Sequence, residues 1–382
     1  MDSQRGKQPS SDQAKSAPQG PVVVMDSSRL WRQNRYIYPV LARRTGGVSI
    51  GVNLNVDKIC NFGCIYCEVN RRMAPLIKDV DLEALTTEMR AALAMAQSGE
   101  LLLDARFAGR AAPDGGALRV TDIAFSGDGE PTSFRNFKAV VERTIALRDE
   151  AGARERPTGA RGAAPGGSPR AAGESAGTQF PQGLPPGGAV QHSGPEAGAR
   201  ERPAGARGAA PGAVQHSGPE AGLPNIKIVV ITNASLFHRP QVREALALVD
   251  RAGGEVWAKL DAGTADYFKL IDDTTIPYER ILRNIRDLGR AQPLVIQSCF
   301  MRVHGVGPSD EEIAAYIGRL RDFLEQGARI KLVQVYSVSR PPAESYVTAL
   351  PPSELEGIRS HVEAALGSIP VRRFDGTWTG AA

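Results

Sequence analysis

The chain reads Cys60-Asn61-Phe62-Gly63-Cys64-Ile65-Tyr66-Cys67, so that three of its four cysteines fall within eight residues. A [4Fe-4S] cluster takes a ligand at each of its four irons, normally a cysteine thiolate. This loop supplies three thiols at Cys-x3-Cys-x2-Cys spacing, and the remaining cysteine, Cys299, lies far downstream in a predicted buried strand. We interpret Cys60, Cys64 and Cys67 as ligands of a [4Fe-4S] cluster whose fourth iron stays open.

Two other uses of these cysteines remain as alternatives. A structural zinc site needs four tetrahedral ligands, usually from two paired half-sites. The sequence has no second cysteine pair, and its histidines are all remote from the loop and unpaired: His192, His216, His238, His304 and His361. A dithiol redox motif at Cys64 and Cys67 leaves Cys60 without a role and lacks a thioredoxin-like context. For Cys299, within an apolar run, the expected role is that of an inert core thiol.

A second motif follows about sixty residues later and reads Ile123-Ala124-Phe125-Ser126-Gly127-Asp128-Gly129-Glu130-Pro131-Thr132. The pattern predicts a strand that ends in a turn. The two glycines let the backbone adopt positive φ and approach a ligand closely, and Pro131 keeps the strand from continuing. Most such turns are only turns, but its place after the cysteine loop makes this one a candidate ligand-binding segment.

Together the two motifs resemble those of the radical S-adenosylmethionine (SAM) superfamily. The resemblance implies that the open iron chelates the amino and carboxylate groups of SAM and that Tyr66 packs near the adenine. It implies that a segment of four residues binds the SAM ammonium: Gly127, Asp128, Gly129 and Glu130. It also implies an electron donor such as flavodoxin or ferredoxin, and cleavage of SAM to methionine and a 5′-deoxyadenosyl radical that abstracts hydrogen from a substrate. The hard chemistry then belongs to the cofactors.

Within that superfamily the chain is similar to the wyosine-synthase-like group of iron-sulfur oxidoreductases. The likeness rests on four segments: 50–54 leading into the cysteine loop, 125–132, 231–233 and 334–342. Wyosine synthases modify a guanosine of transfer RNA, but this chain lacks their extra N-terminal cysteines. We therefore expect a radical SAM oxidoreductase with an unassigned substrate. The alternatives are a tRNA-modifying enzyme and a non-catalytic iron-sulfur or zinc-binding module.

Residues 151–222 differ in composition from the rest of the chain. They hold no lysine, aspartate or isoleucine, and 151–166 recurs as 197–212 with one change, Thr158 to Ala204. Such a segment buries too little apolar surface to offset its chain entropy. We expect a disordered insertion, a disordered tail at 1–24, and one radical SAM domain formed by 25–150 and 223–382. The tail lacks the apolar core of a signal peptide, and we expect a cytoplasmic protein with no membrane association.

The charge balance argues against a broad nucleic-acid-binding surface. The formal net charge is +4, of which the insertion, with seven arginines and five glutamates, supplies +2 and the tail +1. The folded part is left at about +1, which is not the electrostatic footprint of a nucleic-acid binder. A local basic patch at the site mouth remains open, from arginines around the cysteine loop: Arg32, Arg35, Arg43, Arg44, Arg71 and Arg72.

Strand and helix patterns alternate through the folded part. The predicted strands are 48–56, 120–126, 226–233, 255–261, 293–304 and 330–337, and the predicted helices between them are 81–98, 134–151, 240–252, 278–290 and 310–326. This order predicts an α/β fold in which a parallel sheet curls into a barrel. In such barrels the ligand lies at the carboxyl ends of the strands. The resemblance implies the partial (β/α)6 barrel of radical SAM enzymes.

Polar residues at the other strand ends are further candidates for binding SAM or substrate, because end-of-strand groups in parallel barrels usually serve the site. They are Asn233, Lys259, Asp261, Gln297 and Tyr336. Alternation places Lys259 and Asp261 on one face of their strand with Trp257. If that face is inward, the two charges must be paired or bind a ligand.

Overall fold

The computed structural model describes residues 31–69, 78–154 and 226–374. The predicted tail, the predicted insertion from residue 155 on, and Arg71 and Arg72 lie outside these ranges. In chain order the strands and α-helices are β1 (Ile37–Ala42), β2 (Gly47–Val52), α1 (Leu82–Gln97), β3 (Val120–Phe125), α2 (Phe137–Arg154), β4 (Lys227–Thr232), α3 (Pro240–Arg251), β5 (Glu255–Lys259), α4 (Ala265–Asp272), α5 (Tyr278–Ala291), β6 (Leu294–Cys299), β7 (Met301–Val303), α6 (Asp310–Glu325), β8 (Ile330–Tyr336), β9 (Val347–Ala349), α7 (Pro352–Leu366) and β10 (Val371–Phe374).

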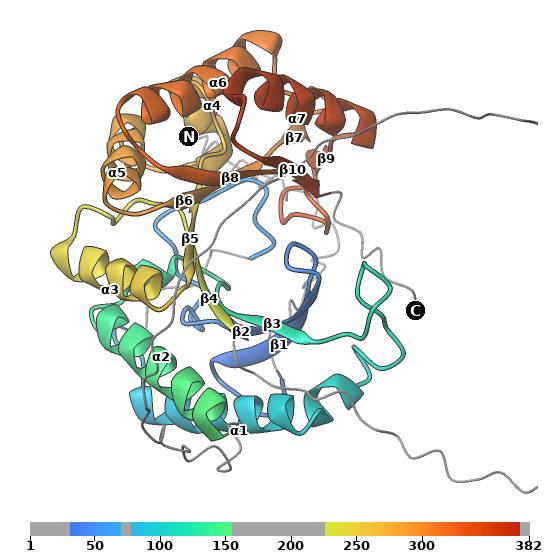
Figure 1. Ribbon diagram of the computed structural model, residues 1–382. Coiled ribbons are helices and arrows are strands. Elements are labelled where there is room, and N and C mark those ends of the chain that lie inside the picture. The colour runs from blue at the N-terminus through green and yellow to red at the C-terminus, as the bar shows by residue number, and fades with distance from the viewer. Residues whose placement is uncertain (1–30, 70–77, 155–225, 375–382) are drawn as a thin grey trace, which may run out of the picture. The chain divides into compact units, whose positions relative to one another are not determined.

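A single eight-stranded sheet positions the site. Its strand order is β1-β2-β3-β4-β5-β6-β8-β10. β1 pairs antiparallel with β2, and each later neighbouring pair is parallel. The sheet curls, and helices cover its outer side (Figure 1). No pairing joins β1 to β10 among the described residues, so the sheet is a partial barrel, as predicted.

The two faces of each parallel strand bury different side chains, because successive residues point to opposite faces. On β4, Ile228 and Val230 join the large core beneath the helices, whereas Val229 packs in a small separate apolar cluster with Trp257 and Val295. Burial on both faces explains why residues 226–233 read as a near-continuous apolar run.

Helix starts follow local capping chemistry. The carboxylate of Asp81 accepts hydrogen bonds from Glu83 N and Ala84 N at the start of α1. Thr264 caps α4 through Tyr267 N, and Ser309 caps α6 through Glu312 N. These side chains satisfy amide groups that have no partner inside the helix. Only five residues separate the end of β5 at Lys259 from the start of α4, the helix that contacts the cysteine loop.

Two predicted strand ranges were wrong. The predicted strand 293–304 consists of β6 and β7, and β7 leaves the main sheet to pair antiparallel with β9. His304 adopts a positive φ of 50°, which ends the extended run. The predicted strand 48–56 stops at Val52, beyond which Asn53 and Asn55 turn their side chains into local hydrogen bonds with the glycine turn and the cysteine loop.

The turn between β1 and β2 crosses the open side of the partial barrel. β1 is one edge of the sheet, and β8 is next to the opposite edge strand, β10. The guanidinium carbon of Arg44 in that turn nevertheless lies 4.3 Å from the centre of the Tyr336 ring at the end of β8. The first hairpin therefore contacts the far wall of the sheet.

Candidate functional site

The cysteine loop follows β2 and is fastened by its backbone to the end of α4. Gly63 N donates to the carbonyl oxygens of Asp272 and Asp273, both at 3.1 Å, and Ile65 N donates to Ile271 O at 2.9 Å. The ring of Phe62 meets Phe268 of α4 edge to face, with centroids 5.8 Å apart. The loop conformation therefore depends on residues that come about two hundred positions later.

The three thiols of the loop are half-buried and line one cavity. Cys64 Sγ donates to Asp272 Oδ1 at 3.2 Å. Burial, and then the nearby Asp272, raise the pKa of the Cys64 thiol. Because iron binds the thiolate, loading this site displaces the thiol proton.

The donor set fits an iron-sulfur cube better than a single ion. A cube binds one thiolate at each iron, so its ligands need not converge on one point. Within residues 31–69, 78–154 and 226–374, no group of three or more His, Cys, Asp or Glu side chains is placed to hold one metal ion. Cys60, Cys64 and Cys67 are the residues that would hold a cluster.

The glycine turn lies against the start of the cysteine loop. A Cβ atom on Gly129 would overlap the carbonyl oxygen of Ile59 and the side chain of Asn55, and a Cβ on Gly127 would overlap Asn53. Only glycine allows this close approach without a shift of the neighbours. Both predicted motifs therefore meet at the carboxyl ends of β2 and β3, as the barrel geometry required.

Glu130 ties the glycine turn to the end of β4. Its buried carboxylate accepts from Thr132 N at 3.1 Å, Thr132 Oγ1 at 2.5 Å, Thr232 Oγ1 at 2.7 Å and Asn233 N at 2.7 Å. Burial raises the pKa of Glu130, although these four hydrogen bonds act to lower it. The side-chain amide of Asn233 in turn donates to Asn61 Oδ1 of the cysteine loop at 2.8 Å.

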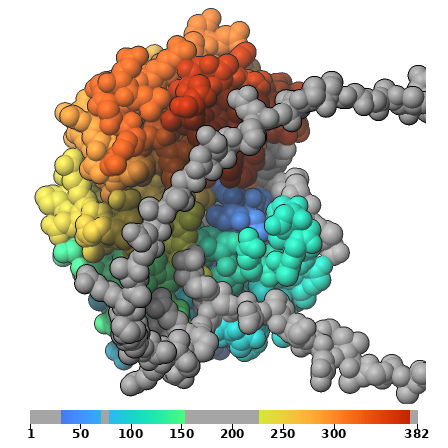
Figure 2. All heavy atoms as spheres, in the orientation of Figure 1, coloured from blue at the N-terminus to red at the C-terminus, as the bar shows by residue number. Residues whose placement is uncertain are grey.

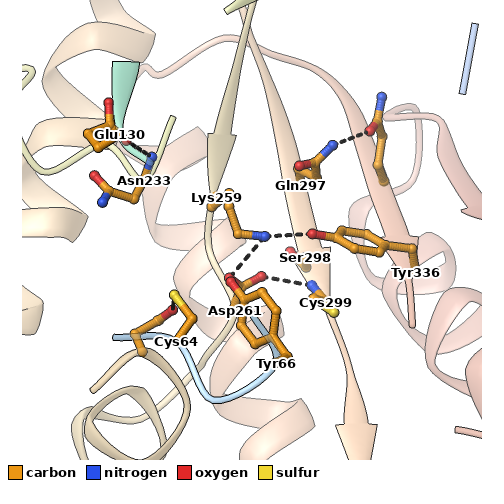
Figure 3. A network of polar contacts seen from close by, with 12 residues as sticks. Cys64, Tyr66, Glu130, Asn233, Lys259, Asp261, Gln297, Ser298, Cys299 and Tyr336 are labelled. Atoms are coloured by element: carbon orange, nitrogen blue, oxygen red, sulfur yellow. Dashed lines mark hydrogen bonds and ion pairs between the residues drawn. The ribbon is translucent and has the colours of Figure 1, made fainter. Parts of the chain in front are cut away.

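A second network links Tyr66 of the loop to β5 and β8 (Figure 3). Tyr66 Oη donates to Asp261 Oδ2 at 2.6 Å, and Lys259 Nζ lies 3.1 Å from the same oxygen and 2.5 Å from Tyr336 Oη. Cys299 N donates to Asp261 Oδ1 at 2.7 Å. Of the two expectations for these charges, pairing or ligand binding, the structure shows pairing, because Lys259 and Asp261 form an ion pair.

The electrostatics of this network keep its protons in place. Burial acts to lower the pKa of Lys259, but Asp261 and Tyr336 outweigh it and raise that pKa well above its usual value. Burial raises the pKa of the Tyr66 hydroxyl, and Asp261 raises it further. Lys259 is therefore a fixed cation, and Tyr66 a fixed hydrogen-bond donor, at neutral pH.

The concave side of the sheet encloses a cavity of about 820 Å³, a volume within the usual range for a small-ligand site. In Figure 2 the surface is hollowed between the orange-red C-terminal elements and the green segment near β3. The three cysteines line this cavity together with eight of the ten residues predicted to bind cofactor or substrate: Tyr66, Gly127, Gly129, Glu130, Asn233, Lys259, Gln297 and Tyr336.

Asp128 and Asp261 do not line this cavity. Asp128 Oδ2 accepts from Asn53 Nδ2 at 2.8 Å, and its backbone N donates to Asn53 Oδ1 at 3.0 Å. Asp261 serves the hydrogen-bond network already described. Both carboxylates hold their neighbours in position. Gln297 does face the cavity, and its Nε2 donates to Gln334 Oε1 at 3.0 Å.

Sequence reasoning missed several supporting residues, chiefly Asn53, Asn55 and Asp272. The sequence did contain a signal for Asn53 and Asn55, because polar residues at alternate positions after a buried strand point to the same side of the sheet. Asp272 had none, since it ends a short helix that no pattern linked to Cys64. Cys299 is buried, as expected, but it also lines the cavity, and burial raises the pKa of its thiol to about 12.

No family model and no curated protein matches the chain. Among solved structures, a radical SAM methyltransferase from Sphaerobacter thermophilus matches with 13% identity and a TM-score of 0.45, over 86% of this chain and 66% of that one. The chain thus spans just under two thirds of the methyltransferase.

Two further solved structures are similar to the chain. TYW1 with a lysine-pyruvate adduct bound matches with 12% identity and a TM-score of 0.40, over 84% of this chain and 74% of that one. A domain of pyruvate-formate lyase-activating enzyme from Bacteroides vulgatus matches with 16% identity and a TM-score of 0.28, over 39% of this chain and 81% of that one. The resemblance of this chain to radical SAM enzymes rests on its cysteine and glycine motifs.

Proposed function

We propose that this chain is a radical SAM enzyme of the oxidoreductase type, with a [4Fe-4S] cluster held by Cys60, Cys64 and Cys67. The observation that carries the proposal is that the three thiols and the Gly127–Glu130 turn line one cavity at the carboxyl ends of the strands. A reduced cluster held there would supply the electron for reductive cleavage of SAM to methionine and a 5′-deoxyadenosyl radical, which would take a hydrogen atom from the substrate.

The protein's own residues bind, orient and exclude water. The backbone of Gly127 and Gly129 gives the SAM ammonium close access to the turn, and the carboxylate of Glu130 keeps the turn in place. Tyr66, held by Asp261, provides an aromatic surface for the adenine. Lys259 is neutralised by Asp261, so it adds no unpaired charge beside the reacting atoms. Ala124, Val229 and Trp257 give part of the cavity wall an apolar surface.

The proposal also includes an electron donor and a cellular compartment. A small reductant protein such as flavodoxin or ferredoxin would deliver the electron. No helix of the described residues is both long and apolar enough to cross a membrane. The sequence segments quoted above favour the wyosine-synthase-like group within the superfamily. The compartment that we propose is the cytoplasm.

The test is SAM cleavage by the reconstituted protein. The chain is loaded anaerobically with iron and sulfide, reduced with dithionite, and assayed by chromatography for 5′-deoxyadenosine. We expect about four irons and four sulfides per chain and formation of 5′-deoxyadenosine. A Cys60/Cys64/Cys67 to Ala triple variant should bind no cluster and form none. A loaded wild-type protein that leaves SAM intact, with and without candidate substrates, would contradict the proposal.

A further inference from the structure

One cation in the cavity wall has neither a hydrogen-bond acceptor nor a counter-ion among the residues that the structure describes. Arg44, in the turn between β1 and β2, makes no hydrogen bond and no ion pair within residues 31–69, 78–154 and 226–374, and its Nε is buried there without an acceptor. Its guanidinium lies 4.3 Å from the centre of the Tyr336 ring. Half-buried charge is normally paired, because removing it from water is costly, and a ring face offsets only part of that cost.

The neighbourhood of Arg44 is basic. Burial lowers the pKa of Arg43, and the charges of Arg340 and Arg44 lower it further, so these three side chains lie close enough to repel one another. All three line the cavity. Glu68 pairs with Arg340 at 3.1 Å and is the acidic group of this cluster. Repulsion between cations at one wall favours binding of an anion there.

The other acidic groups of the cavity are already engaged. Its described lining has five basic residues (Arg43, Arg44, Arg106, Lys259 and Arg340) and three acidic ones (Glu68, Asp122 and Glu130). Lys259 and Arg106 are paired with Asp261 and Asp104, which lie just outside the lining, so the basic character of the cavity comes from the cluster of Arg43, Arg44 and Arg340. The Asp122 carboxylate accepts from Ser49 Oγ at 2.5 Å, Thr45 Oγ1 at 2.7 Å and Thr121 Oγ1 at 2.8 Å. That of Glu130 binds Thr132, Thr232 and Asn233. Neither is available to neutralise Arg44.

We propose that the substrate is a small organic anion and that Arg44 binds its phosphate or carboxylate group in the cavity. This assignment rests on the proposed function, which makes the cavity the active site. A guanidinium matches either oxyanion with two parallel hydrogen bonds. The Arg44 guanidinium lies over the Tyr336 ring, and the Tyr336 hydroxyl accepts a hydrogen bond from Lys259. An anion on Arg44 would therefore lie close to the Tyr66–Asp261–Lys259 network.

Equilibrium dialysis of the reconstituted protein tests this assignment, with radiolabelled inorganic phosphate and radiolabelled acetate as the two probes, each measured at saturating SAM and without SAM. We expect one probe to bind and Arg44→Gln to weaken its binding about tenfold or more, the usual effect of losing a charge-assisted pair. The probe affinity of Arg44→Lys should lie between those of the wild type and Arg44→Gln, because lysine keeps the positive charge but cannot donate two parallel hydrogen bonds. The probe that binds more tightly identifies the anion as phosphate or carboxylate.

Arg90→Gln is the matched control. Arg90 is an exposed arginine whose NH2 lies 3.3 Å from Glu150, far from the cavity lining. The Arg90→Gln protein should bind the probe with an affinity within about twofold of that of the wild type. Thermal unfolding and iron content of each variant show whether it has folded and loaded, and Arg44→Lys serves if Arg44→Gln fails either check.

Four outcomes overturn the assignment. Equal binding by wild type and a folded Arg44 variant removes Arg44 from the site. Binding that SAM abolishes means that Arg44 holds the carboxylate of SAM. Retention of a short RNA oligomer with no binding of either probe means that the anion belongs to a polymer. Wild-type protein that cleaves SAM but binds no probe refutes the inference alone, whereas probe binding at Arg44 without SAM cleavage refutes the proposed function alone.

Discussion

Tyr66 of the cysteine loop donates a 2.6 Å hydrogen bond to Asp261, which lies 195 positions later in the sequence. The same buried carboxylate accepts from Cys299 N and pairs with Lys259. One side chain therefore joins the loop to the ends of β5, β6 and, through Lys259 and Tyr336, β8.

Replacing that carboxylate tests the network. Asp261→Asn keeps the shape of the side chain and leaves Lys259 as a buried cation without its counter-charge. We expect the free energy of unfolding in urea to fall by about 3 kcal/mol. The control is Asp322→Asn, whose partner Arg319 is 3.9 Å away and exposed, and it should cost less than about 1 kcal/mol. Equal losses would mean that the Asp261 network contributes no more than a surface pair.

Glycine at position 129 is required by the space around it. In Gly129→Ala the new methyl group would overlap Ile59 and Asn55 at the start of the cysteine loop, and we expect a loss of about 1–3 kcal/mol from the strain together with weaker SAM binding. Gly318→Ala, in the middle of α6 with no atom near its Cβ position, should instead gain about 0.5–1 kcal/mol. Urea unfolding measures the stability of both variants, and SAM titration measures their affinity for SAM. A Gly129→Ala protein with wild-type stability and SAM affinity would contradict the close approach of the turn to the cysteine loop.

Cys299 should not be a cluster ligand. It lies in the cavity wall, but its backbone is fixed in β6 and its thiol is buried among apolar groups of β7 and β9. Cys299→Ala is expected to retain about four irons per chain after reconstitution, whereas Cys64→Ala should lose the cluster. Iron and sulfide analysis, together with the visible absorption spectrum, measures the cluster content of the two variants. Loss of iron in Cys299→Ala would show that the cube has four protein ligands.

Glu255, at the start of β5, should affect acid stability. Burial acts to raise its pKa, but hydrogen bonds from Lys331, Lys227 and Trp257 lower it from 4.5 to about 2. Because the folded-state pKa is the lower one, the stabilisation is complete above pH 4.5 and is lost as the pH falls toward 2. We expect a loss of about 2–3 kcal/mol across that range.

Urea unfolding at pH 5 and at pH 2.5 measures this effect. Glu255→Gln should be less stable than the wild type at pH 5, and the two proteins should converge at low pH. A difference that stays constant with pH would show that Glu255 stabilises the fold by packing and not by charge.

The sequence predicted the barrel well because the buried parallel strands have an unambiguous pattern. Residues 226–233, 255–261 and 330–337 contain β4, β5 and β8, each with buried apolar residues on both faces. The edge strands β1 and β10 escaped notice. β1 carries Pro39, and β10 is four residues long with Arg372 and Arg373 at its centre, so neither shows the apolar run of a central strand.

The site was predictable where chemistry is local and unpredictable where it depends on contacts between distant residues. The cysteine spacing and the glycine turn identified two walls of the cavity, and strand ends added Lys259 and Tyr336. No local pattern placed Asp272 beside Cys64, or Arg44 across the open side of the sheet on Tyr336. Those contacts arise only when the sheet has curled.

The attachment of the cysteine loop to α4 also has a consequence for the order of synthesis and cluster insertion. Cys64 and Asp272 are 208 positions apart, so at ribosomal rates about 10 to 40 s separate their synthesis. During that interval the thiols emerge without the helix that shapes them and without the aromatic packing of Phe268. We therefore expect insertion of the proposed cluster to follow translation, into a folded barrel and not into the nascent chain.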